Sequence, residues 1–159
     1  MKKPKKCYIV TGLVFLTIGL LCGVYYREFT KALNYSYTYT PLGLVHPHLL
    51  VLGLVINIIL GLLLANFSLN KKQEKIAFVI YNVGVSLTGL LLLVRGTFDV
   101  LSKTNNYMIS GTLSTIISGL AGVSHIVLAV GIIYYFVLIL KSYKNRQISY
   151  STNHYIDWQ

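Results

Sequence analysis

The chain has 159 residues, of which 55% are hydrophobic and 11% are charged, and its formal net charge is +10. A soluble domain usually carries about 25% charged residues, so the composition argues against a soluble domain and favours a membrane protein. A net positive charge is also typical of nucleic-acid-binding proteins, but the positions of the basic residues argue against that function.

Four apolar runs predict four membrane-spanning helices. They cover residues 7–26, 42–67, 76–101 and 113–140, and each reaches the roughly 20 residues that a helix needs to cross the hydrocarbon core. We therefore expect an all-α fold, a four-helix transmembrane bundle with up-down topology formed by residues 1–144. Residues 145–159 are expected to form a polar cytoplasmic tail that is disordered or lies on the inner surface.

The basic residues lie mostly on one side of these helices. Ten precede the first span, connect the second to the third, or follow the fourth, whereas four lie on the other side. This positive-inside bias predicts that both termini are in the cytoplasm of a bacterial plasma membrane. Attraction to the anionic lipid bilayer explains the clusters, and no nucleic-acid partner is expected.

The first predicted helix shares a basic start and an apolar run with cleaved signal peptides. Bulky Leu20 and Leu21 occupy positions where a cleavage site has small residues, so we interpret residues 7–26 as a retained helix. Gly19 and Gly23 form a motif of small residues four apart, which predicts close helix packing. This motif leaves a homodimer open.

The second helix has a predicted start and a predicted kink. Thr40 is a suitable cap and Pro41 suits the first helical position. Pro47, inside the helix, lacks a backbone N–H and predicts a kink. The short connection at residues 68–75 predicts that the second and third helices are antiparallel neighbours.

Polar and small residues indicate which helix faces are buried. In the second helix, one face by the helical period carries His46, Gly53, Asn57 and Gly61. In the fourth helix, a similar stripe carries Ser114, Ser118, Gly122 and His125. Both stripes are expected to face other helices, which favours His46 and His125 as interior residues.

Three histidines lie within the predicted spans: His46, His48 and His125. An ionisable side chain within a bilayer is costly and usually functional. His46 and His48 are about 200° apart around a helix, so they should point to opposite sides. His125 lies further into its span, and we expect a depth difference of about 10 Å, which helix tilt or a later start of the fourth helix would reduce.

Haem is a cofactor that neutral imidazoles in an apolar helical bundle can hold, because its iron takes histidine nitrogens as axial ligands. Arg95 and Arg27 are placed near the outer surface, where they could neutralise the propionates. Copper or zinc would need three or four converging ligands, which the opposed directions of His46 and His48 disfavour. Arg95 and Asp99 are one turn apart, and an interfacial salt bridge is favoured there over a proton relay.

Four segments of the chain, residues 26–31, 44–53, 93–96 and 118–125, resemble an uncharacterised family of small bacterial four-helix membrane proteins, domain of unknown function 2871. The resemblance covers nearly the whole chain, through Leu140, and implies the fold but no activity. The His-x-His pattern before an apolar run and a glycine is more distantly similar to the haem-ligand helix of haem-copper oxidase subunit I and NnrS-type haem proteins. By that similarity His48 would oppose His125, whereas the face argument selects His46.

The sequence therefore predicts an integral membrane protein that binds b-type haem through His125 and either His46 or His48. Electron transfer, haem handling and gas sensing all fit such a protein. The alternative is a non-catalytic membrane partner or assembly subunit whose histidines are structural. No Gly-rich phosphate loop, Cys-x-x-Cys pair or Ser-His-Asp set occurs, so an enzyme acting by itself is disfavoured, and the sequence identifies no redox partner.

Overall fold

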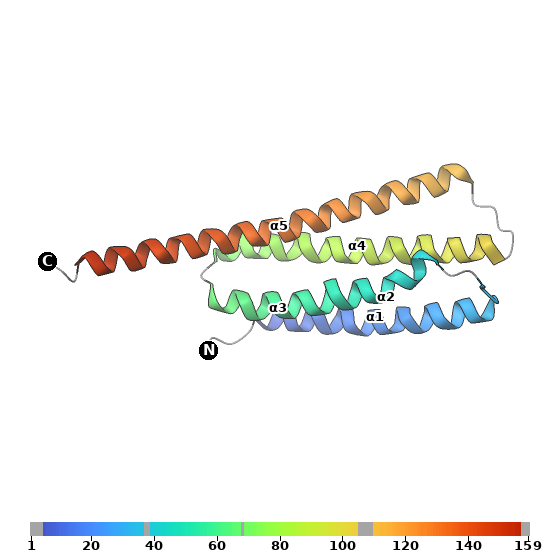
Figure 1. Cartoon of the computed structure of the whole chain (residues 1–159), viewed down its shortest axis with the longest axis horizontal. Helices are drawn as coiled ribbons and strands as arrows, with labels where there is room; N and C mark the ends of the chain where they lie inside the picture. The colour runs from blue at the N-terminus through green and yellow to red at the C-terminus, as the bar shows by residue number, and fades with distance from the viewer. Residues whose placement is uncertain (1–4, 37–38, 68, 105–109, 157–159) are drawn as a thin grey trace.

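The computed structural model describes residues 5–36, 39–67, 69–104 and 110–156, and the side chains of these residues except 146 and 148–156. Within these ranges the fold is all-helical, as the sequence predicted (Figure 1). The elements in chain order are α1 (Lys6–Ala32), η1 (Pro41–Leu44), α2 (Val45–His48), η2 (Leu49–Val55), α3 (Ile56–Leu63), η3 (Leu64–Asn66), α4 (Lys71–Thr104) and α5 (Gly111–Ile156).

Four helical stretches are long and apolar enough to cross a membrane. They are Lys6–Ala32, Pro41–Asn66, Lys71–Thr104 and Gly111–Asn145, and each contains most or all of one predicted span. The helix α5 continues to Ile156, so this part of the expected tail is helical rather than disordered.

The four stretches lie side by side in the order α1, second stretch, α4 and α5, and successive stretches run in opposite directions (Figure 1). The predicted antiparallel arrangement of the second and third helices is therefore confirmed. We call the end that carries Lys6, Lys71 and Lys141 the basic end, and the opposite end the far end. Near the far end the first part of α5 diverges from α4 (Figure 1).

Small residues let α4 and α5 approach closely in the half of the molecule nearer the basic end. A Cβ atom added at Gly84 would lie 2.6 Å from Cα of Leu128, and one added at Gly131 would lie 2.7 Å from Cα of Tyr81. Next to these contacts, the Thr88 hydroxyl donates to Oγ of Ser124 at 3.2 Å, and both residues are buried. The two helices therefore pack backbone against backbone in this half.

Buried tyrosines close the basic end. The hydroxyls of Tyr8 on α1 and Tyr135 on α5 are 2.8 Å apart, and the Tyr8 hydroxyl also donates to Glu74 Oε1 at 3.3 Å. Glu74 forms an ion pair with Lys5. Tyr81 donates from its hydroxyl to the carbonyl oxygen of Leu52 at 2.5 Å. Because buried hydroxyls need hydrogen-bond partners, this network fixes α1, the second stretch, α4 and α5 together.

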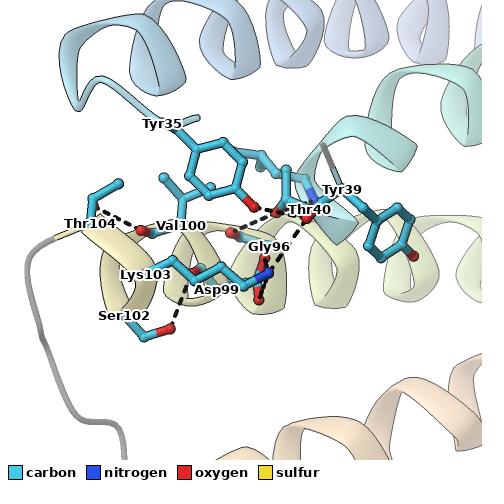
Figure 2. Close-up of polar contacts among 10 residues, drawn as sticks. Tyr35, Tyr39, Thr40, Gly96, Asp99, Val100, Ser102, Lys103 and Thr104 are labelled. Atoms are coloured by element: carbon cyan, nitrogen blue, oxygen red, sulfur yellow. Dashed lines mark hydrogen bonds and ion pairs between the residues drawn. The ribbon is translucent and has the colours of Figure 1, made fainter. Parts of the chain in front are cut away.

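At the far end, polar contacts attach the segment before η1 to α4 (Figure 2). Lys103 Nζ pairs with Asp99 at 3.0 Å and donates to the carbonyl oxygen of Tyr39 at 3.5 Å. The predicted salt bridge between Arg95 and Asp99 was wrong, because Asp99 pairs with Lys103, one turn further along α4. Tyr35 donates to the same Tyr39 carbonyl at 2.8 Å.

The second stretch begins where the sequence predicted but is not a simple kinked helix. Thr40 Oγ1 caps it by accepting from the backbone N–H of Leu42 at 3.4 Å, and Pro41 occupies the first position. Beyond Pro47 the helix changes to a seven-residue π-helix, η2. Proline removes a backbone donor and crowds the preceding turn, and π-helical turns are one way in which a helix accommodates such a disturbance.

Candidate functional site: a histidine pair between two helices

The fold brings together two of the three predicted ligand residues, His48 on α2 and His125 on α5. Their ring centroids are 6.5 Å apart and the ring planes are nearly perpendicular, at 83°. The two residues are 77 positions apart in the sequence. His48 is half-buried, whereas His125 is exposed at the border of the α5 face that packs on α4.

Both imidazoles are held in the same way by their own helices. Nδ1 of His48 is 2.8 Å from the carbonyl oxygen of Leu44, and Nδ1 of His125 is 2.7 Å from that of Ala121. A carbonyl oxygen can only accept, so in each neutral ring Nδ1 carries the proton and donates. Each Nε2 therefore keeps its lone pair, which is the arrangement of a histidine poised to bind a metal.

The spacing of the rings fits a metal ion between them. The centroid separation of 6.5 Å is close to what two nitrogen–metal bonds of about 2 Å each would require. Among the described residues no three His, Cys, Asp or Glu side chains form a metal-binding group, which does not favour a copper or zinc site built from protein ligands alone. Haem needs only two protein ligands, since the porphyrin supplies the other four nitrogens.

His46 faces away from this pair. Its Nδ1 is 2.8 Å from the carbonyl oxygen of Gly19 on α1, and a Cβ added at Gly23 would lie 3.0 Å from the same nitrogen. The prediction that His46 and His48 point to opposite sides is therefore confirmed. The residue that lies next to His125 is His48 and not His46, which the face argument favoured. The motif formed by Gly19 and Gly23 packs against the second stretch within the chain.

The stripe arguments had mixed outcomes. The stripe of His46 does face a helix, since Cβ atoms added at Gly53 and Gly61 would meet Phe15 and Tyr8 of α1. The stripe of His125 does not, because Ser114 and Gly122 are exposed. The buried side of α5 is displaced by about one residue from the expected stripe and consists of Ile117, Ala121, Ser124 and Leu128.

The expected depth difference between His48 and His125 was also wrong. A Cβ atom added at Gly96 would overlap the backbone of Leu42, so η1 lies beside Gly96. Gly96 is eight residues before the end of α4 at Thr104, which is a distance of about 12 Å along the helix. The second stretch thus begins well inside the molecule, and His48 reaches the level of His125.

The two predicted arginines have different positions. Arg95 lies seven residues beyond Thr88, on the side of α4 that faces α5, and about 10 Å nearer the far end. It is exposed and forms no ion pair with any residue in the described part of the chain. Arg27 lies on α1 and pairs with its neighbour Glu28 at 3.1 Å. The structure brings only Arg95 to the same side of the molecule as the histidine pair.

One known family matches the part of the chain that contains the candidate site. The model of a family described as a protein of unknown function (DUF2871) matches residues 5–142, which include all three histidines and Arg95. The chain belongs to this family. No curated protein and no solved structure matches the chain.

The residues that hold the imidazoles were not anticipated from the sequence. Leu44 and Ala121 each precede a histidine by four positions. Side chains in a helix point back toward its N-terminus, so this spacing is the signal from which the bond between each ring and a carbonyl four residues earlier could have been predicted. The tyrosine pair of Tyr8 and Tyr135, 127 positions apart, has no comparable signal, because only the packing of α1 near α5 creates it.

Proposed function

We propose that this protein spans a bacterial plasma membrane with its basic end in the cytoplasm, and that it binds one b-type haem between His48 and His125. The observation that carries the proposal is the pair of imidazoles from two helices, 6.5 Å apart, each fixed through Nδ1. The positive-inside rule supports the orientation.

The residues around the pair support haem rather than a bare metal ion. Arg95 is exposed and supplies a positive charge about 10 Å from the level of the pair, where it would neutralise a propionate. Near the far end the first part of α5 diverges from α4 (Figure 1), and in this proposal the haem would enter between these two helices.

In this proposal each side chain has a defined task. His48 and His125 would donate Nε2 lone pairs, and the carbonyl groups of Leu44 and Ala121 orient the rings. His46 holds α1 against the second stretch. Haem would supply an iron that exchanges one electron. Because both His48 and His125 would be engaged in holding it, electron transfer is favoured over gas sensing.

One observation favours the alternative, a membrane partner subunit with structural histidines. His46 already acts in this way, since its ring bonds across helices to a backbone carbonyl. Its Nδ1 reaches another helix, whereas the Nδ1 atoms of His48 and His125 are satisfied within their own helices. The Nδ1 bonds of His48 and His125 therefore do not hold one helix against another. For this reason we prefer metal ligation to a structural role for these two residues.

The test is the absorption spectrum of the detergent-purified protein from haem-supplied cells, oxidised and then reduced with dithionite. We expect a sharp Soret band and narrow reduced α and β bands, and both His48→Ala and His125→Ala should lose this low-spin spectrum. His46→Ala is the matched control and should keep it. A protein that stays colourless after haem addition, or a spectrum unchanged in His125→Ala, would refute the proposal.

The proposed orientation has its own test. A green fluorescent protein fused after Gln159 should fluoresce in intact bacteria, since it folds in the cytoplasm, and the fusion should fractionate with the inner membrane. An alkaline phosphatase fusion at the same place should be inactive. The opposite pattern would reverse the orientation without affecting the haem proposal.

A further inference from the structure

A second candidate site lies on a different side of the second stretch from His125. It is an apolar groove of about 490 Å³ between α1 and α4, within the range of small-molecule sites. Six of its lining residues are Ile18, Leu21, Cys22, Leu93, Val94 and Phe98.

A smaller cavity adjoins the groove. It has a volume of about 160 Å³, shares Ile18, Cys22 and Leu93 with the groove, and reaches Leu49 and Gly89. We call the groove and this adjoining cavity together the slot, and both are lined mainly by apolar side chains. A flexible hydrocarbon chain suits such a slot, because it would bury apolar surface on both sides.

One polar feature marks the mouth of the groove. The hydroxyl of Tyr25 and Oγ1 of Thr97 both belong to lining residues and are 3.2 Å apart. Tyr25 is held in place by stacking on Phe29, with ring centroids 5.1 Å apart. In a pair of hydroxyls one O–H group donates to the other, and the second O–H group is free to donate to a ligand.

The mouth fits a neutral acceptor better than an anion. None of the groove's lining residues is charged, whereas phosphate and carboxylate groups are usually bound by Arg or Lys. The nearest basic residue along α1, Arg27, is two positions and about 200° around the helix from Tyr25, and it pairs with Glu28. A ring carbonyl on an apolar chain therefore matches the mouth and the slot.

We propose that this groove binds an isoprenoid quinone, with a ring carbonyl accepting from the hydroxyl pair of Tyr25 and Thr97 and the isoprenoid chain lying in the slot. Choosing a redox-active lipid over any other amphiphile rests on the proposed haem function. Leu49 lines the inner cavity and directly follows His48, so the groove and the histidine pair lie on two sides of a single helical turn.

The test is calorimetric titration of ubiquinone-2, a short isoprenoid quinone, into the detergent-purified chain. We expect saturable binding at one site, which Tyr25→Phe and Thr97→Val should each weaken by about three- to tenfold, the loss of one hydrogen bond. Cys22→Phe should fill the slot and abolish binding. Tyr39→Phe and Thr115→Val, which remove exposed hydroxyls away from the groove, should bind as the wild type does.

Squalene, an isoprenoid without a ring, serves as the second ligand. Absence of saturable ubiquinone-2 binding would overturn the inference, as would equal binding of squalene together with no effect of the two hydroxyl variants. The latter result would assign the groove to lipid hydrocarbon chains. If Cys22→Phe does not fold, the two hydroxyl variants decide.

Repeating the titration on protein purified without haem separates the two proposals. Binding of ubiquinone-2 to this protein, with the same loss in Thr97→Val, would support the quinone site whatever the haem spectrum shows. A low-spin haem spectrum without quinone binding would refute the quinone site alone.

Discussion

Replacing Gly84 with alanine tests how closely α4 and α5 pack. The new Cβ atom would lie 2.6 Å from Cα and 2.7 Å from the backbone nitrogen of Leu128. Carbon atoms pack best at about 3.5–4.0 Å, so the two helices would have to separate locally by about 1 Å. Because the neighbour is backbone rather than a flexible side chain, no rotamer change can relieve the overlap.

The expected size of the effect follows from two opposing contributions. Overpacking of this kind costs about 1–3 kcal/mol, whereas alanine gains about 1 kcal/mol over glycine in helix propensity. We expect Gly84→Ala to lower the free energy of unfolding by up to about 2 kcal/mol, the difference between these contributions. In a chain of this size each kcal/mol corresponds to about 2–4 °C in Tm.

The matched control is Gly119→Ala, the same substitution in α5. A Cβ atom at Gly119 meets nothing within 4 Å, so only the propensity gain applies and Tm should rise by a few degrees. The assay is thermal unfolding in detergent, followed by circular dichroism. If both variants shift Tm in the same direction and by the same amount, the close approach of α4 and α5 at Gly84 is wrong.

Three further predictions concern the polar contacts. Tyr8→Phe and Tyr135→Phe each break a buried hydrogen bond and should lower the free energy of unfolding by about 1–3 kcal/mol. Tyr8→Phe should be the more harmful because Tyr8 also donates to Glu74. In thermal unfolding the double variant should lose less stability than the sum of the two single variants, and strict additivity would contradict the contact. His46→Ala should lower stability by about 1–3 kcal/mol, since it removes the bond to Gly19 and its packing, while leaving any haem spectrum unchanged; a variant as stable as the wild type in the same assay would count against this role. Lys103→Met should lower the free energy of unfolding by less than about 1 kcal/mol, because the ion pair of Lys103 is partly exposed. The difference in Tm from the wild type should disappear in 1 M salt. A difference that persists in salt would mean that packing rather than charge is lost.

The helices themselves could be predicted because their signals are local. Run length, hydropathy and the Thr40–Pro41 start are properties of neighbouring residues, and each of the four helical stretches lies where an apolar run predicted it. The opposed directions of His46 and His48 likewise follow from the helical period alone. The continuation of α5 to Ile156 was missed because polar residues carry no burial pattern.

The pairing of the histidines could not be derived from periodicity, because it depends on where the helices lie relative to one another. The buried side of α5 is offset from the stripe of small residues, and η1 is recessed beside Gly96. The offset of the buried side of α5 and the recessed position of η1 both arise from contacts between helices. The residue pattern of one helix alone does not predict such contacts.

The contrast between the two halves of α5 has a consequence for the candidate site. Near the basic end α5 is fixed by backbone contacts at Gly84 and Gly131 and by the Tyr8–Tyr135 bond, whereas its first turns diverge from α4 (Figure 1). His125 is three residues from Leu128, about 4.5 Å along the helix, and it directly follows Ser124, which bonds to Thr88. The closely packed half of α5 therefore fixes the place of His125 beside His48, so backbone contacts rather than the imidazoles themselves preset the spacing of the two rings.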